Sequence, residues 1–127
     1  MKYLPAENIL QIHFEVIEAI GGAHGLRDLG LLESAAERPR ATFGGKSLYP
    51  NLFLKGAALV HSLLLNHPFT DGNKRTAVLV LMEFFLLNGK EISATQKEVV
   101  DFALWIENQK PEIEEIAAWI KKHSRKK

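Results

Sequence analysis

The stretch His67-Pro68-Phe69-Thr70-Asp71-Gly72-Asn73-Lys74-Arg75-Thr76-Ala77 holds an imidazole, a carboxylate, a carboxamide and two cations within nine residues. Apolar residues recur at three- and four-residue intervals on either side, which predicts helices over residues 52–66 and 74–87. Pro68 cannot continue the first helix, because its ring clashes with the preceding turn and it lacks an N–H group. Gly89, just after the second helix, suits a left-handed helix end. The stretch is therefore a short loop between two core helices.

The end of this loop has the properties of an anion site. Gly72 and Asn73 stand at the start of the second helix, where unpaired N–H groups and the positive end of the helix dipole gather. Lys74 and Arg75 add two full positive charges there. Aspartate, glycine and asparagine are also ordinary residues of turns and helix caps. However, a plain turn needs no such concentration of acid, base and cations, and the combination favours a phosphate-binding function.

These residues resemble the signature of the Fic/Doc family. With lysine at position 74, the motif is similar to that of the death-on-curing (Doc) branch. The branch that transfers AMP usually has a glycine at that position. The upstream sequence follows the pattern of the same branch in order: Gly21-Gly22, Gly25-Leu26-Arg27-Asp28, Gly30-Leu31-Leu32-Glu33-Ser34, Arg38-Pro39, Phe43-Gly44-Gly45 and Tyr49-Pro50. The resemblance implies a helical fold, ATP as the co-substrate and a protein hydroxyl as the acceptor.

Phosphoryl transfer requires that the reacting groups are positioned and that the charge on the phosphate is stabilised, and the loop contains candidate residues for both roles. A hydroxyl nucleophile needs a proton acceptor, and His67 is the histidine of the loop. Mg²⁺ accompanies ATP and prefers oxygen ligands, and Asp71 is the carboxylate of the loop. The expected nucleotide-binding residues are the four that follow: Gly72, Asn73, Lys74 and Arg75.

Each of the four nucleotide-binding candidates has an expected role, and so does Phe69. Gly72 lets the backbone approach phosphate closely, and Asn73 either braces the loop or donates its amide. Arg75 offers a planar fork to phosphate oxygens, whereas Lys74 supplies a point charge. Phe69 is expected to anchor the loop in the core, because an aromatic side chain between polar groups would otherwise be exposed.

The resemblance implies a particular reaction. In the Doc branch the γ-phosphate of ATP is transferred, so the expected protein is a kinase-like toxin. Its expected target is a threonine of elongation factor Tu, whose modification stops translation. Two alternatives remain open. One is an AMP transferase that acts on a protein target, and the other is a non-catalytic module whose loop binds a nucleotide or anion.

The resemblance also implies a restraining partner. Many Fic proteins carry an inhibitory Ser/Thr-x-x-x-Glu-Gly/Asn motif, but here Ser34 is followed four residues later by Arg38, and Ser93 by Lys97. We therefore expect a separate antitoxin similar to Phd, whose C-terminal segment forms a helix in an apolar groove. Unpaired apolar surface on the first helices is the expected seat of that helix.

Four further helices are predicted, from apolar periodicity and from proline, glycine and capping-box signals: residues 5–20, 31–38, 95–108 and 111–122. Pro5 and Pro111 are expected at first helical positions. The basic residues after 122 are expected to be a solvated end, and no alternation predicts a strand of any length. The predicted fold is all-α, a single domain over residues 1–127 that forms a bundle of about six helices.

Residues 42–50 contain glycines and no periodicity, which indicates a loop or short hairpin. The resemblance implies that this segment is the flap beside the active site, which holds the backbone of the target. Phe43, Lys46 and Tyr49 are the candidate target contacts. His13 lies beside the apolar stripe of the first helix and is expected to pack there without a polar partner.

Composition limits the class of protein. A chain of 127 residues with 46% hydrophobic residues fits one domain with a real core. The net charge of +1 gives no general basic field, which argues against nucleic acid as a partner. The chain has no cysteine, so no disulfide framework is expected. The N-terminus lacks the apolar core of a signal peptide, and no segment approaches the ~20 apolar residues of a membrane span. We expect a cytoplasmic protein without a membrane partner.

Overall fold

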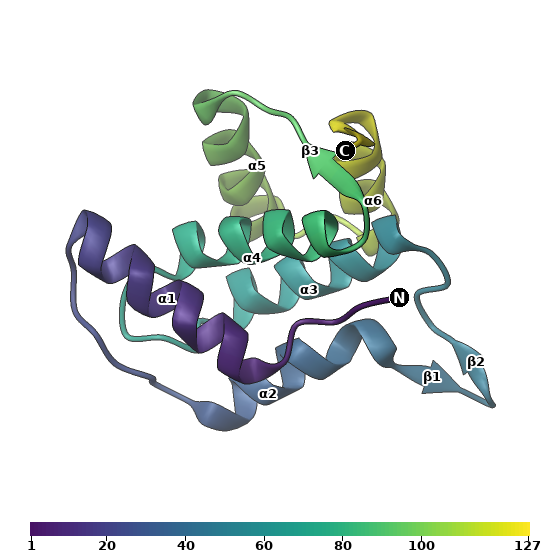
Figure 1. The fold of residues 1–127 in the computed structure, drawn as a ribbon. Coiled ribbons are helices and arrows are strands. Elements are labelled where there is room, and N and C mark those ends of the chain that lie inside the picture. Colours follow the sequence, from purple (N-terminus) through teal and green to yellow (C-terminus); the bar gives the residue numbers. More distant parts are fainter.

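The computed structural model describes all 127 residues, which form six α-helices, one 3-10 turn and two short antiparallel strand pairs (Figure 1). In chain order the elements are α1 (Ala6–Ile20), α2 (Leu29–Glu37), η1 (Arg38–Arg40), β1 (Thr42–Phe43), β2 (Lys46–Ser47), α3 (Leu52–Asn66), α4 (Asn73–Leu87), β3 (Lys90–Ile92), α5 (Gln96–Gln109), α6 (Ile113–Lys122) and β4 (Ser124–Lys126). The predicted helical bundle is confirmed. None of the helices has both the length and the apolar character needed to span a membrane.

Helix α3 is the centre of the molecule. Every residue from Lys55 to Val60 is buried, because α2, α4, α5 and α6 all pack against this helix. A helix that is apolar on all sides is suited to such a position. Gly56 allows the close approach of α4, since a Cβ there would lie 2.5 Å from a ring carbon of Phe85. Figure 1 shows α1 and α2 on one side of the α3–α4 pair and α5 and α6 on the other.

Several predicted boundaries move by one or two residues, for reasons visible at the helix ends. Pro5 has an extended backbone and is the N-cap of α1, and its carbonyl accepts the first hydrogen bonds of the helix. Pro111 is buried two residues before α6, whose N-cap is Glu112. Asp28 caps α2 by accepting a hydrogen bond from the N–H of Leu31, so this helix begins earlier than predicted.

The end of the chain corrects a prediction. Residues 124–126 are not a free solvated end, because β4 pairs antiparallel with β3, which follows α4. Arg125 lies opposite Glu91, and their side chains form an ion pair at 3.1 Å. The strands are three residues long and mostly polar, so they leave no hydrophobic alternation from which a pairing can be predicted.

Helix α1 buries Ile9, Val16 and Ile17, whereas other apolar residues of this helix are exposed. Phe14 and Ile20 are 50% and 56% exposed. His13 takes a buried position together with Ile9 and Val16. The buried side of α1 therefore contains an imidazole, and this imidazole faces the loop between α3 and α4.

Candidate active site

Residues 67–72 form the loop between α3 and α4, and the connection from α1 to α2 runs alongside it. Leu26 forms an antiparallel bridge with Phe69, and the N–H of Thr70 donates to the carbonyl of Gly25 at 3.0 Å. The N–H groups of residues 27 and 28 both donate to the carbonyl of Pro68, at 2.8 and 3.1 Å. The backbone of the loop is therefore fixed by residues that lie about forty positions earlier in the chain.

Asn73 and Phe69 brace the loop from inside. The carboxamide of Asn73 accepts a hydrogen bond from the N–H of Phe69 at 3.0 Å and donates one to its carbonyl at 2.9 Å. Both ends of the amide are thus engaged within the chain, and bracing is the part that the structure assigns to Asn73. The ring of Phe69 is 2% exposed, which confirms that this residue anchors the loop in the core.

His13 supports the other side of the loop, and the expectation that it has no polar partner is wrong. Its ring stacks on that of Phe69, with the centroids 3.8 Å apart and the planes 3° from parallel. Its Nε2 donates to the backbone carbonyl of Asp71 at 2.8 Å. The partner is a main-chain atom 58 residues away, which no residue type in the sequence reveals.

The carboxylate of Asp71 is exposed and oriented by two backbone donors. Oδ2 accepts from the N–H of Ala23 at 3.1 Å, and Oδ1 accepts from the N–H of Gly72 at 2.8 Å. These hydrogen bonds stabilise the charged form and hold the pKa of Asp71 below its ordinary value. Gly22 permits this arrangement, because a Cβ at that position would lie 2.7 Å from Oδ2.

His67 is held through both its backbone and its ring. It ends α3 in the left-handed conformation, with φ of 47°, and its carbonyl accepts a hydrogen bond from Nε of Arg27 at 2.7 Å. The guanidinium of Arg27 also donates to the carbonyl of Asn66. The imidazole is half exposed, and its Nε2 lies 3.2 Å from a carboxylate oxygen of Glu107 on α5.

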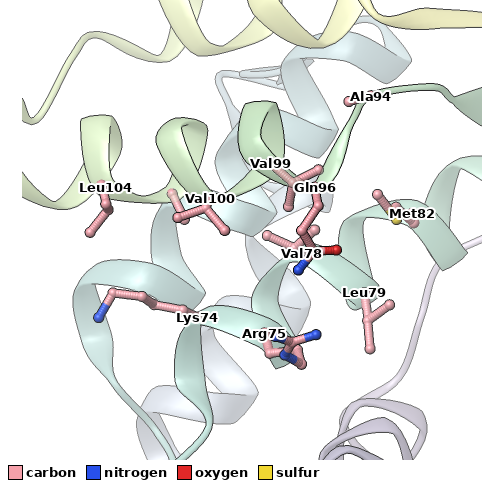
Figure 2. Close-up of a pocket in the computed structure, with 11 residues that line it drawn as sticks. Lys74, Arg75, Val78, Leu79, Met82, Ala94, Gln96, Val99, Val100 and Leu104 are labelled. Carbon is pink, nitrogen blue, oxygen red and sulfur yellow. The ribbon is translucent and has the colours of Figure 1, made fainter.

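The two cations stand in the first turn of α4. Lys74 forms an ion pair with Glu107 at 3.3 Å, whereas the guanidinium of Arg75 has no hydrogen-bond or ion-pair partner within the chain. Figure 2 shows both residues at one end of a pocket between α4 and α5, with a volume of about 360 Å³. The apolar residues of its walls are Val78, Leu79, Met82, Ala94, Val99, Val100, Ala103 and Leu104.

The residues present fit a nucleotide with Mg²⁺. The first intrahelical hydrogen bond of α4 is made by the N–H of Thr76, so the N–H groups of the three preceding residues have no acceptor in the helix. The hydroxyl of Thr76 is buried without a hydrogen-bond partner. Mg²⁺ commonly binds one or two carboxylates together with substrate phosphates, and Asp71 provides such a carboxylate beside the turn.

The structure does not bring the flap candidates to this site. The β1–β2 hairpin precedes α3, whereas His67 follows it, and a helix of 15 residues is about 22 Å long. Figure 1 shows the β1–β2 hairpin projecting from the molecule beyond the start of α3. Phe43 in β1 and Lys46 in β2 are exposed. The hydroxyl of Tyr49 accepts a hydrogen bond from Arg38 at 3.0 Å. The expected position of this segment beside the active site is therefore corrected, and residues 21–28 lie there instead.

Four residues that position the site were not identified as functional from the sequence: His13, Ala23, Arg27 and Glu107. A partial signal exists for one of them, since Arg27 stands in a glycine-containing segment that matches the family pattern. Ala23 acts through its backbone, which carries no signal of residue type. Glu107 is one of several acidic residues on its helix, and only the fold places it beside the loop.

Comparisons with known proteins agree with this geometry. A family model described as the Fic/DOC family matches residues 3–86, which include the loop, His13 and residues 21–28. Toxin Doc of Mycolicibacterium smegmatis is 47% identical over 93 residues, 73% of this chain and 69% of that protein. Protein kinase doc of Escherichia phage P1 is 28% identical over 92 residues, 72% of each chain. These similarities confirm the resemblance seen in the sequence, and the chain therefore belongs to the Fic/Doc family.

Proposed function

We propose that this protein is the toxin of a toxin–antitoxin pair and that it transfers the γ-phosphoryl group of ATP to the hydroxyl of another protein. One observation carries the proposal: a single braced loop presents an accessible imidazole, an exposed carboxylate and the N-terminal turn of α4 with its two cations. The names of the two relatives, Toxin Doc and Protein kinase doc, support the toxin and kinase parts of the proposal.

In the proposed reaction, His67 takes the proton of the acceptor hydroxyl as its oxygen forms a bond to the γ-phosphorus. The bond between that phosphorus and the bridging oxygen breaks, and ADP leaves. The N–H groups at the start of α4, with Lys74 and Arg75, bind the phosphates. Asp71 would hold Mg²⁺, which when bound neutralises charge on the phosphate oxygens.

The proposed acceptor is a threonine of elongation factor Tu, whose modification would stop translation in the cytoplasm. The support is the resemblance of the loop to the Doc branch, and in particular Lys74, which stands where the AMP-transferring branch usually has a glycine. The same resemblance supports transfer of the γ-phosphate over transfer of AMP. The two alternatives from the sequence are an AMP transferase and a non-catalytic binding module, and an assay with labelled ATP distinguishes both from the kinase.

We also propose that the helix of a Phd-like antitoxin lies in the pocket between α4 and α5. This seat differs from the one expected from the sequence, the first helices, where Phe14 and Ile20 are also exposed. This pocket is apolar, and three of its side chains are 39–46% exposed: Leu79, Val100 and Leu104. Lys74 and Arg75 at its end would pair with an acidic side chain of the partner (Figure 2). A partner bound there would cover the cations on which nucleotide binding depends.

The test is an assay of the purified protein with Mg²⁺, elongation factor Tu and ATP labelled at either the α- or the γ-phosphate. We compare the wild type with His67→Ala and with a control, His123→Gln, which changes a histidine at the end of α6. Transfer of γ-label that is lost only in His67→Ala is the expected result. Transfer of α-label would indicate an AMP transferase. Nucleotide binding without any transfer, unchanged by His67→Ala, would indicate a binding module.

A further inference from the structure

Glu107 on α5 contacts His67 of the active-site loop and Lys74 in the first turn of α4. One of its carboxylate oxygens lies 3.2 Å from Nε2 of His67, and the other lies 3.3 Å from Nζ of Lys74. Its side chain is 14% exposed, whereas those of His67 and Lys74 are 52% and 56% exposed. The side chain of Glu107 is therefore the least exposed of the three.

This contact determines which ring nitrogen of His67 carries the proton. An ionised carboxylate only accepts hydrogen bonds, and the ammonium of Lys74 provides the opposite charge beside it. The hydrogen on the imidazole must then be on Nε2, where it is donated to Glu107. In a neutral ring the other nitrogen, Nδ1, keeps its lone pair. Nδ1 of His67 has no hydrogen-bond partner within the chain, so it is free to accept a proton.

We infer that Glu107 is a positioning residue that fixes the tautomer and orientation of His67, so that Nδ1 receives the proton of the acceptor hydroxyl. The inference rests on the proposed function. When the proton moves from the acceptor oxygen to Nδ1, the ring becomes an imidazolium whose positive charge lies beside the carboxylate of Glu107. The same step forms the bond from the acceptor oxygen to phosphorus and releases ADP, so no further reactant is needed.

The surroundings of the ring agree with this role. Nε of Arg27 donates to the carbonyl of His67 at 2.7 Å, so the backbone and the imidazole of His67 are each held by a separate side chain. A cavity of about 390 Å³, lined in part by His67, Glu107 and Lys110, leaves space next to the ring. Restraint of a catalytic base by a second residue reduces the reorganisation needed for reaction.

The test compares the wild type with Glu107→Ala, Glu107→Gln and a matched control, Asp101→Asn, which removes an exposed carboxylate from the same helix. We expect Glu107→Ala to lower kcat for phosphoryl transfer by about 10- to 100-fold, with the KM for ATP changed less than about twofold. Glu107→Gln, which retains a hydrogen-bond acceptor, should lie between Glu107→Ala and the wild type. The control should match the wild type.

A spectroscopic measurement tests the tautomer without relying on activity. Nitrogen-15 shifts of the His67 ring should show the proton on Nε2 in the wild type and in Asp101→Asn, and a mixture of tautomers in Glu107→Ala. A structural role of Glu107 alone would leave the ring tautomer unchanged. If His67→Ala does not impair transfer, the proposed function fails, and the ring spectra still decide whether Glu107 fixes the tautomer.

Lys74→Ala separates the two contacts of Glu107. If Glu107→Ala still lowers kcat in the Lys74→Ala background, its effect passes through His67, as inferred. The inference is overturned if Glu107→Ala leaves kcat unchanged, or if it raises only the KM for ATP, because the carboxylate would then act through Lys74. An increase in kcat would also overturn it, since the contact would then restrain the site.

Discussion

The connections before and after α2 look alike in sequence and differ in their surroundings. Residues 21–28 and residues 41–51 are both largely exposed and both contain glycines with positive φ. The first connection runs along the active-site loop and shares backbone hydrogen bonds with it. The second forms the β1–β2 hairpin at the opposite end of α3, where its contacts are with α3 and η1.

The glycines show what this difference means physically. A Cβ at Gly22 would lie 2.7 Å from Oδ2 of Asp71, and one at Gly25 would lie 2.8 Å from the hydroxyl of Thr70. At Gly44 and Gly45 a Cβ would meet nothing within 4 Å. The first pair of glycines allows close approach to functional groups, whereas the second pair serves only the turn. Glycine content alone therefore does not identify the segment that borders the site.

Two arginines give the largest expected contrast between the connections. Arg27→Ala removes the donors that hold the carbonyls of Asn66 and His67. We expect phosphoryl transfer to fall about 100-fold, because small displacements of a catalytic group have large effects on rate. Arg38→Ala removes a half-buried guanidinium that bonds to Tyr49 and to α3. Transfer per folded molecule should stay within about twofold of the wild type, while the free energy of unfolding falls by about 1–3 kcal/mol.

Both variants are measured by labelled transfer and by urea unfolding. If Arg38→Ala lowers transfer as much as Arg27→Ala does, the proposed difference between the two connections is contradicted, because the hairpin would then influence the site across the length of α3. The difference is also contradicted if Arg27→Ala lowers only the free energy of unfolding, because the connection before α2 would then not position His67 for transfer.

The next contrast uses one added methyl group. Gly22→Ala places a Cβ against the carboxylate of Asp71 at a φ of +116°, so we expect displacement of that side chain and about tenfold lower transfer. Raised Mg²⁺ should restore part of the activity if Asp71 is the metal ligand. Gly44→Ala has a φ of +59° and open space around it, and transfer should change by less than about twofold. Equal losses in the two variants would contradict the difference in surroundings.

Much of the fold was predictable because its signals are local. The bounds of α3 match the prediction, since its apolar run ends at Pro68. The capping box of Thr95 and Glu98 is present, with both of its hydrogen bonds. The pairing of β3 and β4 was not predictable, because two short polar strands 34 residues apart meet only after α5 and α6 have folded.

The candidate site divides in the same way. The loop residues were predicted together because they are contiguous in sequence, and a single turn between α3 and α4 brings them close to one another. Their supports are not contiguous. His13 donates to a backbone carbonyl of the loop, and Ala23 acts through its own backbone N–H on the side chain of Asp71. Glu107 reaches the loop from a helix 40 residues away. The family resemblance placed the hairpin at the site, and the composition of the segment does not show which end of α3 it adjoins.

A smaller contrast concerns the protein acceptor. Leu26 is 38% exposed beside the loop, and Phe43 is 80% exposed on the hairpin. If residues 21–28 contact the target, Leu26→Ala should raise the KM for the acceptor about fivefold and leave the KM for ATP unchanged, as expected for one interface residue. Phe43→Ala should leave both values within about twofold. The opposite pattern would show that the hairpin contacts the target, although it lies far from His67.

The smallest expected effect is on the free energy of unfolding. It comes from the hydrogen bond that joins the connection before α2 to the active-site loop, from the N–H of Ala23 to the carboxylate of Asp71. This bond and that from Gly72 hold the folded-state pKa of Asp71 below the ordinary value of 3.8. A lowered folded-state pKa stabilises the fold at pH values above 3.8, and that stabilisation is lost as the pH falls through the folded-state value. The difference in unfolding free energy between the wild type and Asp71→Asn should therefore be constant from about pH 5 to 7 and shrink below 3.8. Urea unfolding without Mg²⁺ measures it, and a difference that persists unchanged in acid would show that the connection before α2 does not stabilise the charged carboxylate.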